Sequence, residues 1–153
     1  MAAWHEIERD APDFARRVRE RFEAGRHKTI ATLRRDGAPR ISGIELQFED
    51  GHMTFGMSGG SLKLLDVRRD PRVAIHSPSL DPPEDGATWG GDAKLAGRAV
   101  EMPPPADNPF EGAGFFRLDI TEAVLTYLGG SPPDHMVIES WHAGRGWRRQ
   151  TRD

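Results

Sequence analysis

The stretch from His52 to Ser77 constrains the fold more than any other part of the sequence. Met53, Phe55 and Met57 alternate with small or polar residues, which is the period of two expected of a strand with one buried face. A glycine pair, a short helical pattern and a second apolar run follow. The stretch therefore predicts a strand, a tight turn, a short helix and a second strand.

The predicted helix has a clear beginning and end. Ser61 stands where a helix N-cap should stand, and Pro71 ends the helix because the residue before a proline is pushed out of the α region. Its expected apolar stripe is formed by Leu62, Leu64 and Leu65.

The start of this helix has the composition of an anion site. Gly59 and Gly60 supply backbone that a ligand can approach closely, and Ser58, Ser61 and Lys63 add two hydroxyls and an ammonium group. The free N–H groups and positive dipole end of a helix N-terminus favour an anion. A phosphate would fit there, although a solvated lysine on a surface helix explains the spacing about equally well.

A second helix is expected near the N-terminus. Asp10 can cap it, Phe14, Val18 and Phe22 recur every four residues, and Gly25 ends it. We expect its aromatic stripe to pack on the core.

The rest of the chain reads as short strands joined by turns. Asp36-Gly37 and Asp50-Gly51 are hairpin signals. The expected strands are Thr29 to Arg34, Arg40 to Phe48, Asp92 to Met102, Phe115 to Ile120, Val124 to Leu128 and Met136 to Trp141. Many short strands with only two helices predict a mainly β (α+β) protein, an antiparallel barrel forming a single domain over residues 1–153.

Composition excludes several classes of function. The net charge of −3 argues against a nucleic-acid binder. No apolar run approaches the roughly 20 residues of a membrane span, and no signal-peptide pattern is visible, so we expect a cytoplasmic protein. The chain has no cysteine, which excludes disulfides and thiolate catalysis. Its six histidines are spread without metal-ligand spacing, so no metal site is expected.

Several of these motifs occur in an order that is similar to that of a known family. Asp36-Gly37-Ala38-Pro39, Asp50-Gly51, the run from Phe55 to Lys63 and Asp70-Pro71-Arg72-Val73 together resemble the pyridoxamine 5′-phosphate oxidase-like family of FMN-binding split-barrel proteins. The resemblance is good over residues 28–77 and looser to the C-terminus. It implies an antiparallel split β-barrel with a few short helices, a bound flavin and a homodimer with the cofactor at its interface.

The resemblance also suggests which residues bind the flavin. Lys63, Ser58 and Ser61 would hold its phosphate, while Ser42 adjoins a position under the flavin where many members carry an arginine. Trp141 and one C-terminal arginine, for which we choose Arg149, would reach the partner's flavin. The expected cofactor-binding residues are Arg40, Ser42, Gly43, Met57, Ser58, Ser61, Lys63, Trp141 and Arg149.

Three functions are consistent with this resemblance and with the expected flavin-binding residues. The first is an FMN-dependent reductase or oxidase of a small molecule, and the second is a reductase of the same fold that uses an 8-hydroxy-5-deazaflavin coenzyme. The third is a non-catalytic protein that binds a flavin or haem. Flavin chemistry needs no acid or base constellation from the protein, and none is apparent. Pyridoxamine-phosphate oxidation itself is disfavoured, because Ser42, Leu46 and Gln47 do not supply the basic residues it needs.

Overall fold

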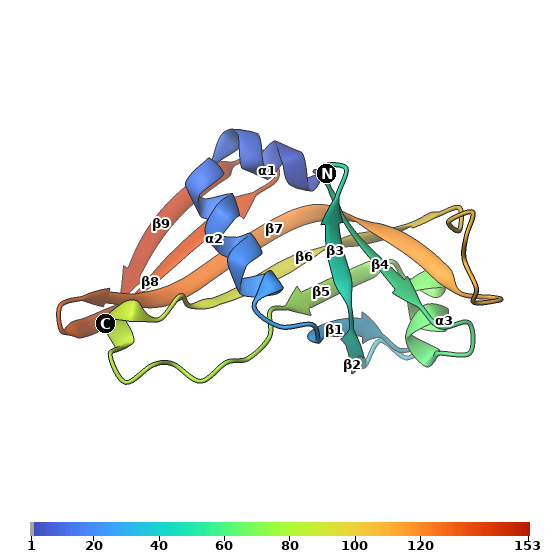
Figure 1. The fold of residues 1–153 in the computed structure, drawn as a ribbon, viewed down its shortest axis with the longest axis horizontal. Helices are drawn as coiled ribbons and strands as arrows, with labels where there is room; N and C mark the ends of the chain where they lie inside the picture. The colour runs from blue at the N-terminus through green and yellow to red at the C-terminus, as the bar shows by residue number, and fades with distance from the viewer. Residues whose placement is uncertain (1) are drawn as a thin grey trace.

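The computed structural model describes residues 2–153, and it is built mostly of antiparallel strands (Figure 1). The helices are α1 Trp4–Asp10, α2 Pro12–Glu23, α3 Leu62–Arg69 and a short 3-10 turn, η1, Gly86–Thr88. The strands are β1 Lys28–Leu33, β2 Pro39–Ile44, β3 Leu46–Glu49, β4 His52–Met57, β5 Arg72–His76, β6 Asp92–Met102, β7 Gly114–Gly130, β8 Pro133–His142 and β9 Gly146–Arg152.

All nine strands belong to one sheet, with the order β2-β1-β5-β6-β7-β4-β3. The two ends of this path, β2 and β3, are consecutive in sequence and are separated by Glu45 alone. The sheet therefore curls until its first and last strands meet covalently, which makes a barrel that is open along this line. β8 and β9 extend from β7 as a separate ribbon.

Strand β7 connects the barrel to the ribbon. Its first residues pair with β4 and its last residues pair with β8, while β6 lies along its other edge from Phe115 to Thr126. The prediction of two strands separated by a turn at Thr121 was wrong, because the ladder with β6 continues past this residue with one register shift at Ala96/Gly97. The prediction of β6 from Asp92 to Met102 is confirmed.

The predicted strand from Arg40 to Phe48 is divided in two. Residues up to Ile44 pair with β1, and residues from Leu46 pair with β4. The alternation of buried and exposed side chains nevertheless continues through the bend, so that Ile44 and Leu46 are buried while Glu45 faces solvent. The strand changes partner, which an alternating pattern in the sequence does not reveal.

Two helices, rather than one, precede the barrel. α1 was not predicted, and Asp10 ends α1 instead of capping α2, whose N-cap is Ala11. The aromatic stripe of α2 is confirmed, because Phe14 and Phe22 are buried in the core. α2 crosses β6 and β7 on one face of the sheet (Figure 1).

Helix α3 turns a different face to the core than expected. Leu64 and Val67 are buried, whereas Leu62 and Leu65 are 57% and 56% exposed. The buried positions are three apart, as on one face of a helix. The predicted stripe was therefore correct only at Leu64.

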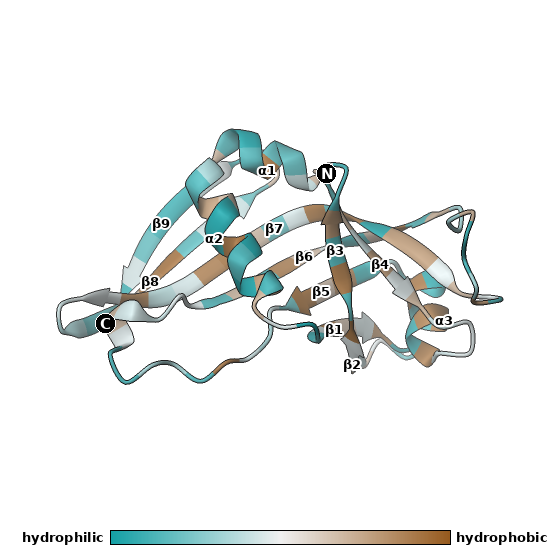
Figure 2. Ribbon diagram, viewed as in Figure 1, coloured by the Kyte–Doolittle hydropathy of each residue, from teal (hydrophilic) through white to brown (hydrophobic). Residues whose placement is uncertain are grey.

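Hydrophobic residues are concentrated in the barrel strands, and most residues of β9 are hydrophilic (Figure 2). Among residues 2–153, no helix combines the length and the apolar character needed to cross a lipid bilayer.

A buried carboxylate ties α2 to the ribbon. Glu139 on β8 is 2% exposed, and it accepts hydrogen bonds from Arg17 at 2.6 and 2.7 Å, from the Tyr127 hydroxyl at 2.5 Å and from Trp147 Nε1 at 3.0 Å. Burial opposes ionisation of this group, but the bonds from Arg17, Tyr127 and Trp147 outweigh burial and lower its pKa below the usual value for glutamate.

This network predicts a pH-dependent stability. A lowered pKa in the folded state contributes stability above the unfolded-state pKa, and this contribution is lost as the pH falls through the folded-state pKa. We expect the urea midpoint to fall as the pH is lowered from 6 to below the ordinary glutamate pKa of about 4.3. The fall should be smaller in Glu139→Gln. Parallel curves for the two proteins would contradict this assignment.

Candidate functional site

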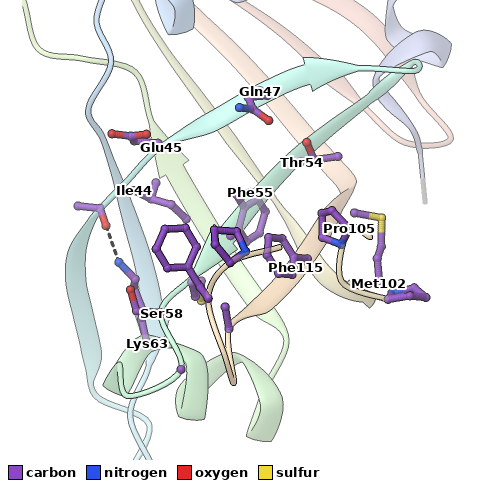
Figure 3. A pocket seen from close by; sticks show the side chains of 18 of the residues that line it. Ile44, Glu45, Gln47, Thr54, Phe55, Ser58, Lys63, Met102, Pro105 and Phe115 are labelled. Atoms are coloured by element: carbon purple, nitrogen blue, oxygen red, sulfur yellow. Dashed lines mark hydrogen bonds between the residues drawn. The ribbon is translucent and has the colours of Figure 1, made fainter. Parts of the chain in front are cut away.

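A cavity of about 880 Å³ lies along the line where the barrel is open. This volume is within the range of roughly 300–1,000 Å³ that is usual for ligand sites. Its walls come from the outer surfaces of β2, β3 and β4, from the start of α3 and from the connection between β6 and β7 (Figure 3). Segments distant in sequence therefore combine at one place on the surface.

Lys63 provides the cationic end of this cavity. Its Nζ donates a 2.8 Å hydrogen bond to the carbonyl oxygen of Gly43, which holds the ammonium group between α3 and β2 (Figure 3). Ser58 lines the cavity beside it. A Cβ built on Gly43 or Gly60 would have no heavy atom within 4 Å, so a ligand can come close to the backbone at both residues.

Two of the other predicted residues help to shape this end of the cavity. The Ser61 hydroxyl donates to the Ser58 carbonyl at 2.8 Å, which closes the turn before α3. Ser61 is the N-cap by position, but its side chain makes no cap hydrogen bond. Met57 lines the cavity but is only 2% exposed, so it lies mainly in the core beneath it.

An apolar part of the lining, formed by the end of β6, the start of β7 and the loop between them, was not predicted. It includes Met102, Pro103, Pro105, Phe110 and Phe115. Met102 and Phe115 share the outer face of the sheet with Gln47 and Thr54. Phe115 lies over Gly56 of β4, with ring atoms 3.4 and 3.6 Å from where a Cβ would stand. The sequence shows residues 103–112 only as a proline-rich loop, and the loop becomes part of a site because β6 and β7 are adjacent in the sheet.

The wall formed by β3 and β4 is polar. Gln47, Glu49 and Thr54 line it, and the Thr54 hydroxyl donates to Glu49 at 2.8 Å. Figure 3 shows Lys63 at one end of the cavity, and Gln47, Thr54, Pro105, Met102 and Phe115 further from it. The cavity thus offers a cation at one end and both polar and apolar groups beyond it.

Arg40 does not line the cavity, because it belongs to a buried ion-pair network. Its Nε donates to Asp66 of α3 at 2.7 Å, and Thr32 and Arg69 bond to the same carboxylate at 2.8 and 3.0 Å. Burial opposes ionisation of Asp66, but these three bonds lower its pKa below the usual range. Arg40 therefore fixes α3, which carries Lys63, against β1 and β2.

Three further predicted residues lie outside the cavity. Ser42 is half-buried on β2, facing the same side as Arg40 and away from Gly43. Trp141 is 3% exposed in the core, where its Nε1 donates to Asp10 at 3.3 Å. Arg149 is exposed on β9. Within this chain, the structure brings together Gly43, Met57, Ser58 and Lys63.

The glycine turn at the site packs closely against the neighbouring loop. A Cβ on Gly59 would lie 2.8 Å from Gly112 backbone atoms, so the Gly59→Ala protein must displace the loop. We expect a loss of about 1–2 kcal/mol in unfolding free energy, measured by urea denaturation. Gly60→Ala is the matched control, since nothing lies near its Cβ position. Equal stabilities of the two variants would contradict the packing described here.

Comparison with known proteins identifies the fold. No protein-family model and no curated protein matches the sequence. A pyridoxamine 5′-phosphate oxidase-related, FMN-binding protein from Nostoc punctiforme aligns over 100% of this chain and 98% of its own, with 14% identity and a TM-score of 0.64. PhzG from Burkholderia lata, solved with tetrahydrophenazine-1-carboxylic acid, aligns over 92% of this chain and 86% of its own, with 13% identity and a TM-score of 0.61.

A third similar structure has a different function. HutZ, a haem storage protein from Vibrio cholerae, aligns over 71% of this chain and 88% of its own, with 14% identity and a TM-score of 0.52. At 13–14% identity, the similarity to all three proteins is one of fold. The expected antiparallel split β-barrel is confirmed, and the chain has the fold of the pyridoxamine 5′-phosphate oxidase-related, FMN-binding proteins.

Proposed function

We propose that this protein binds FMN in the cavity along the open line of the barrel and acts as a flavin-dependent oxidoreductase. The observation that carries the proposal is Lys63, held by Gly43 at the start of α3 with Ser58 beside it. This end of the cavity suits a phosphate, because an ammonium, a hydroxyl and a helix N-terminus converge there. The fold of FMN-binding proteins supports the same assignment.

The flavin would supply the redox chemistry, and the protein would bind and orient it. Lys63 and Ser58 would neutralise and hold the phosphate. The open backbone at Gly43 offers hydrogen-bonding groups close to this end of the cavity. Phe110 and Phe115 offer flat apolar surface further along it, where a second ring system would lie beside the flavin.

The charge of the cavity favours FMN over the deazaflavin coenzyme. A polyglutamyl tail would need a channel lined by several lysines or arginines. Among residues 2–153, Lys63 is the one lysine lining the cavity and no arginine lines it, whereas Glu45, Glu49 and Glu111 do. A tail with several carboxylates would be repelled by these glutamates.

The proposed homodimer has a candidate surface. The outer face of β1, β2, β5 and β6 has a second hollow, of about 340 Å³, lined by residues that include Ala31, Ile41, Ala74 and Ala96. Ile41 is 74% exposed there, and a second copy would cover it. The exposed Arg149 is available to a partner chain, whereas the buried Trp141 is not.

The first test is a titration of the purified protein with FMN, followed by tryptophan and flavin fluorescence. Saturable micromolar binding is expected, together with reduction of the bound flavin by a nicotinamide nucleotide or its reoxidation by an electron acceptor. Binding without any electron transfer would favour a non-catalytic flavin protein. No binding of FMN would refute the proposal, and titrations with the deazaflavin coenzyme and with haem would then decide between the alternatives.

A further inference from the structure

The side chains that line the cavity beyond Lys63 indicate which molecules it selects. We propose that the part of the cavity between β3 and the 103–112 loop binds a planar aromatic substrate that carries a positive charge, and that it rejects anions. This inference rests on the proposed function, in which the flavin phosphate occupies the Lys63 end. It concerns the substrate, which the fold alone does not identify.

The apolar wall gives the preference for a flat molecule. Phe110 and Phe115 line the cavity together with Met102 and three prolines. Phe110 is 68% exposed, although an aromatic side chain of this size usually lies in the core. The exposed ring of Phe110 is therefore available to a ring bound in the cavity. Aromatic rings attract one another in offset or edge-to-face arrangements.

The same wall favours a cation. The face of an aromatic ring carries partial negative charge, so that a positive group close to it is attracted. Phe115 lies beside Gly56, with ring atoms 3.4 and 3.6 Å from where a Cβ of that residue would stand. A cationic ring system would therefore gain from contact with this wall as well as from its own apolar surface.

The part of the lining on β3 has the complementary charge. Glu49 lies beyond Gln47 on β3 and is oriented by the Thr54 hydroxyl at 2.8 Å. No lysine or arginine among residues 2–153 forms an ion pair with Glu49, and Glu45 has only a 4.0 Å contact with Arg26. Arg117, opposite Thr54 in the β4–β7 ladder, does not line the cavity.

Carboxylates and aromatic rings thus act in the same direction within one cavity. The bound phosphate would neutralise Lys63, the one cation on the lining among the described residues. The remaining charge on the walls would then come from Glu45, Glu49 and Glu111, so that an anionic substrate would meet repulsion throughout. Solvent screening limits the effect, since these side chains are exposed.

The test compares three probes of similar shape and different charge. N-methylquinolinium, quinoline and quinoline-4-carboxylate are titrated by calorimetry into the FMN-loaded protein at low salt. The cation should bind at least tenfold more tightly than the carboxylate, with quinoline between them. Raising the salt concentration should reduce this difference. Equal affinities, or tighter binding of the carboxylate, would overturn the proposal.

Two variants separate the contributions of the walls. Glu49→Gln should reduce the preference for the cation at least threefold without changing FMN affinity, and Phe115→Ala should weaken the cation and quinoline together. Glu8→Gln, an exposed glutamate on α1, is the control and should change nothing. A preference unaltered by Glu49→Gln would overturn the role of this wall.

The outcomes distinguish this inference from the proposed function. If FMN fails to bind the wild-type protein, the proposed function fails, and the same three titrations without FMN still measure the selectivity of the walls. If FMN binds and the three probes bind equally, only the inference about the substrate fails.

Discussion

Replacing Lys63 by alanine is expected to weaken FMN binding more than tenfold. A charge-assisted hydrogen bond to a phosphate is worth about 1.5–3 kcal/mol, and Lys63 is the one lysine lining the cavity among residues 2–153. The variant also loses the bond to the Gly43 carbonyl, but this bond is exposed, so little stability should be lost. Affinity is measured by quenching of flavin fluorescence, and folding by circular dichroism.

A matched control removes a positive charge elsewhere. Arg35 is exposed in the turn between β1 and β2, outside the cavity, and Arg35→Ala should bind FMN as the wild type does. If Lys63→Ala and Arg35→Ala have equal affinities, the phosphate does not lie at the start of α3. The proposed orientation of the flavin would then be wrong.

Replacing Asp66 by alanine is expected to cost about 3 kcal/mol of unfolding free energy. Breaking a buried ion pair by removing one partner typically costs 3–5 kcal/mol, because the remaining charge is left uncompensated. We expect the lower end of this energy range, because the side chains of Arg40 and Arg69 are 18% and 33% exposed and can still reach water. Urea denaturation at pH 7 measures the loss.

The Asp66→Ala change should also reduce FMN affinity, since α3 then lacks the contacts that fix it to β1 and β2. Asp81→Ala, at an exposed position in the 77–91 loop, is the control and should have wild-type stability. A loss of less than about 1 kcal/mol in Asp66→Ala would mean that the buried network does not hold the helix.

The sequence predicted those features that depend on neighbouring residues. The alternation around Met53, Phe55 and Met57 and the run from Asp92 to Met102 identified strands, because one-sided burial repeats every two residues. Lys63 and Ser58 were assigned to one end of a site because a turn and a helix start bring them together locally. These assignments needed no information about distant segments.

The features that the sequence did not predict depend on distant partners. Arg40 was assigned to the cofactor because it is two residues from Ser42 on the same face of β2, and its bond to Asp66, 26 residues away on another element, could not be seen in the sequence. Trp141 was expected at the flavin, but α1, which was not predicted, supplies Asp10 as its hydrogen-bond acceptor. The aromatic wall at Phe110 becomes apparent only once β6 and β7 are placed side by side.

The long strand β7 has a consequence for the order in which the protein can fold during synthesis. β4 pairs with β7 at residues 114–117, and the backbone of Ala2 bonds to Ile120. Until this segment leaves the ribosome, one edge of β4 and one edge of β6 stay unpaired, and unpaired edges promote aggregation. The nascent chain therefore passes through a vulnerable interval that ends only when most of its residues have been made.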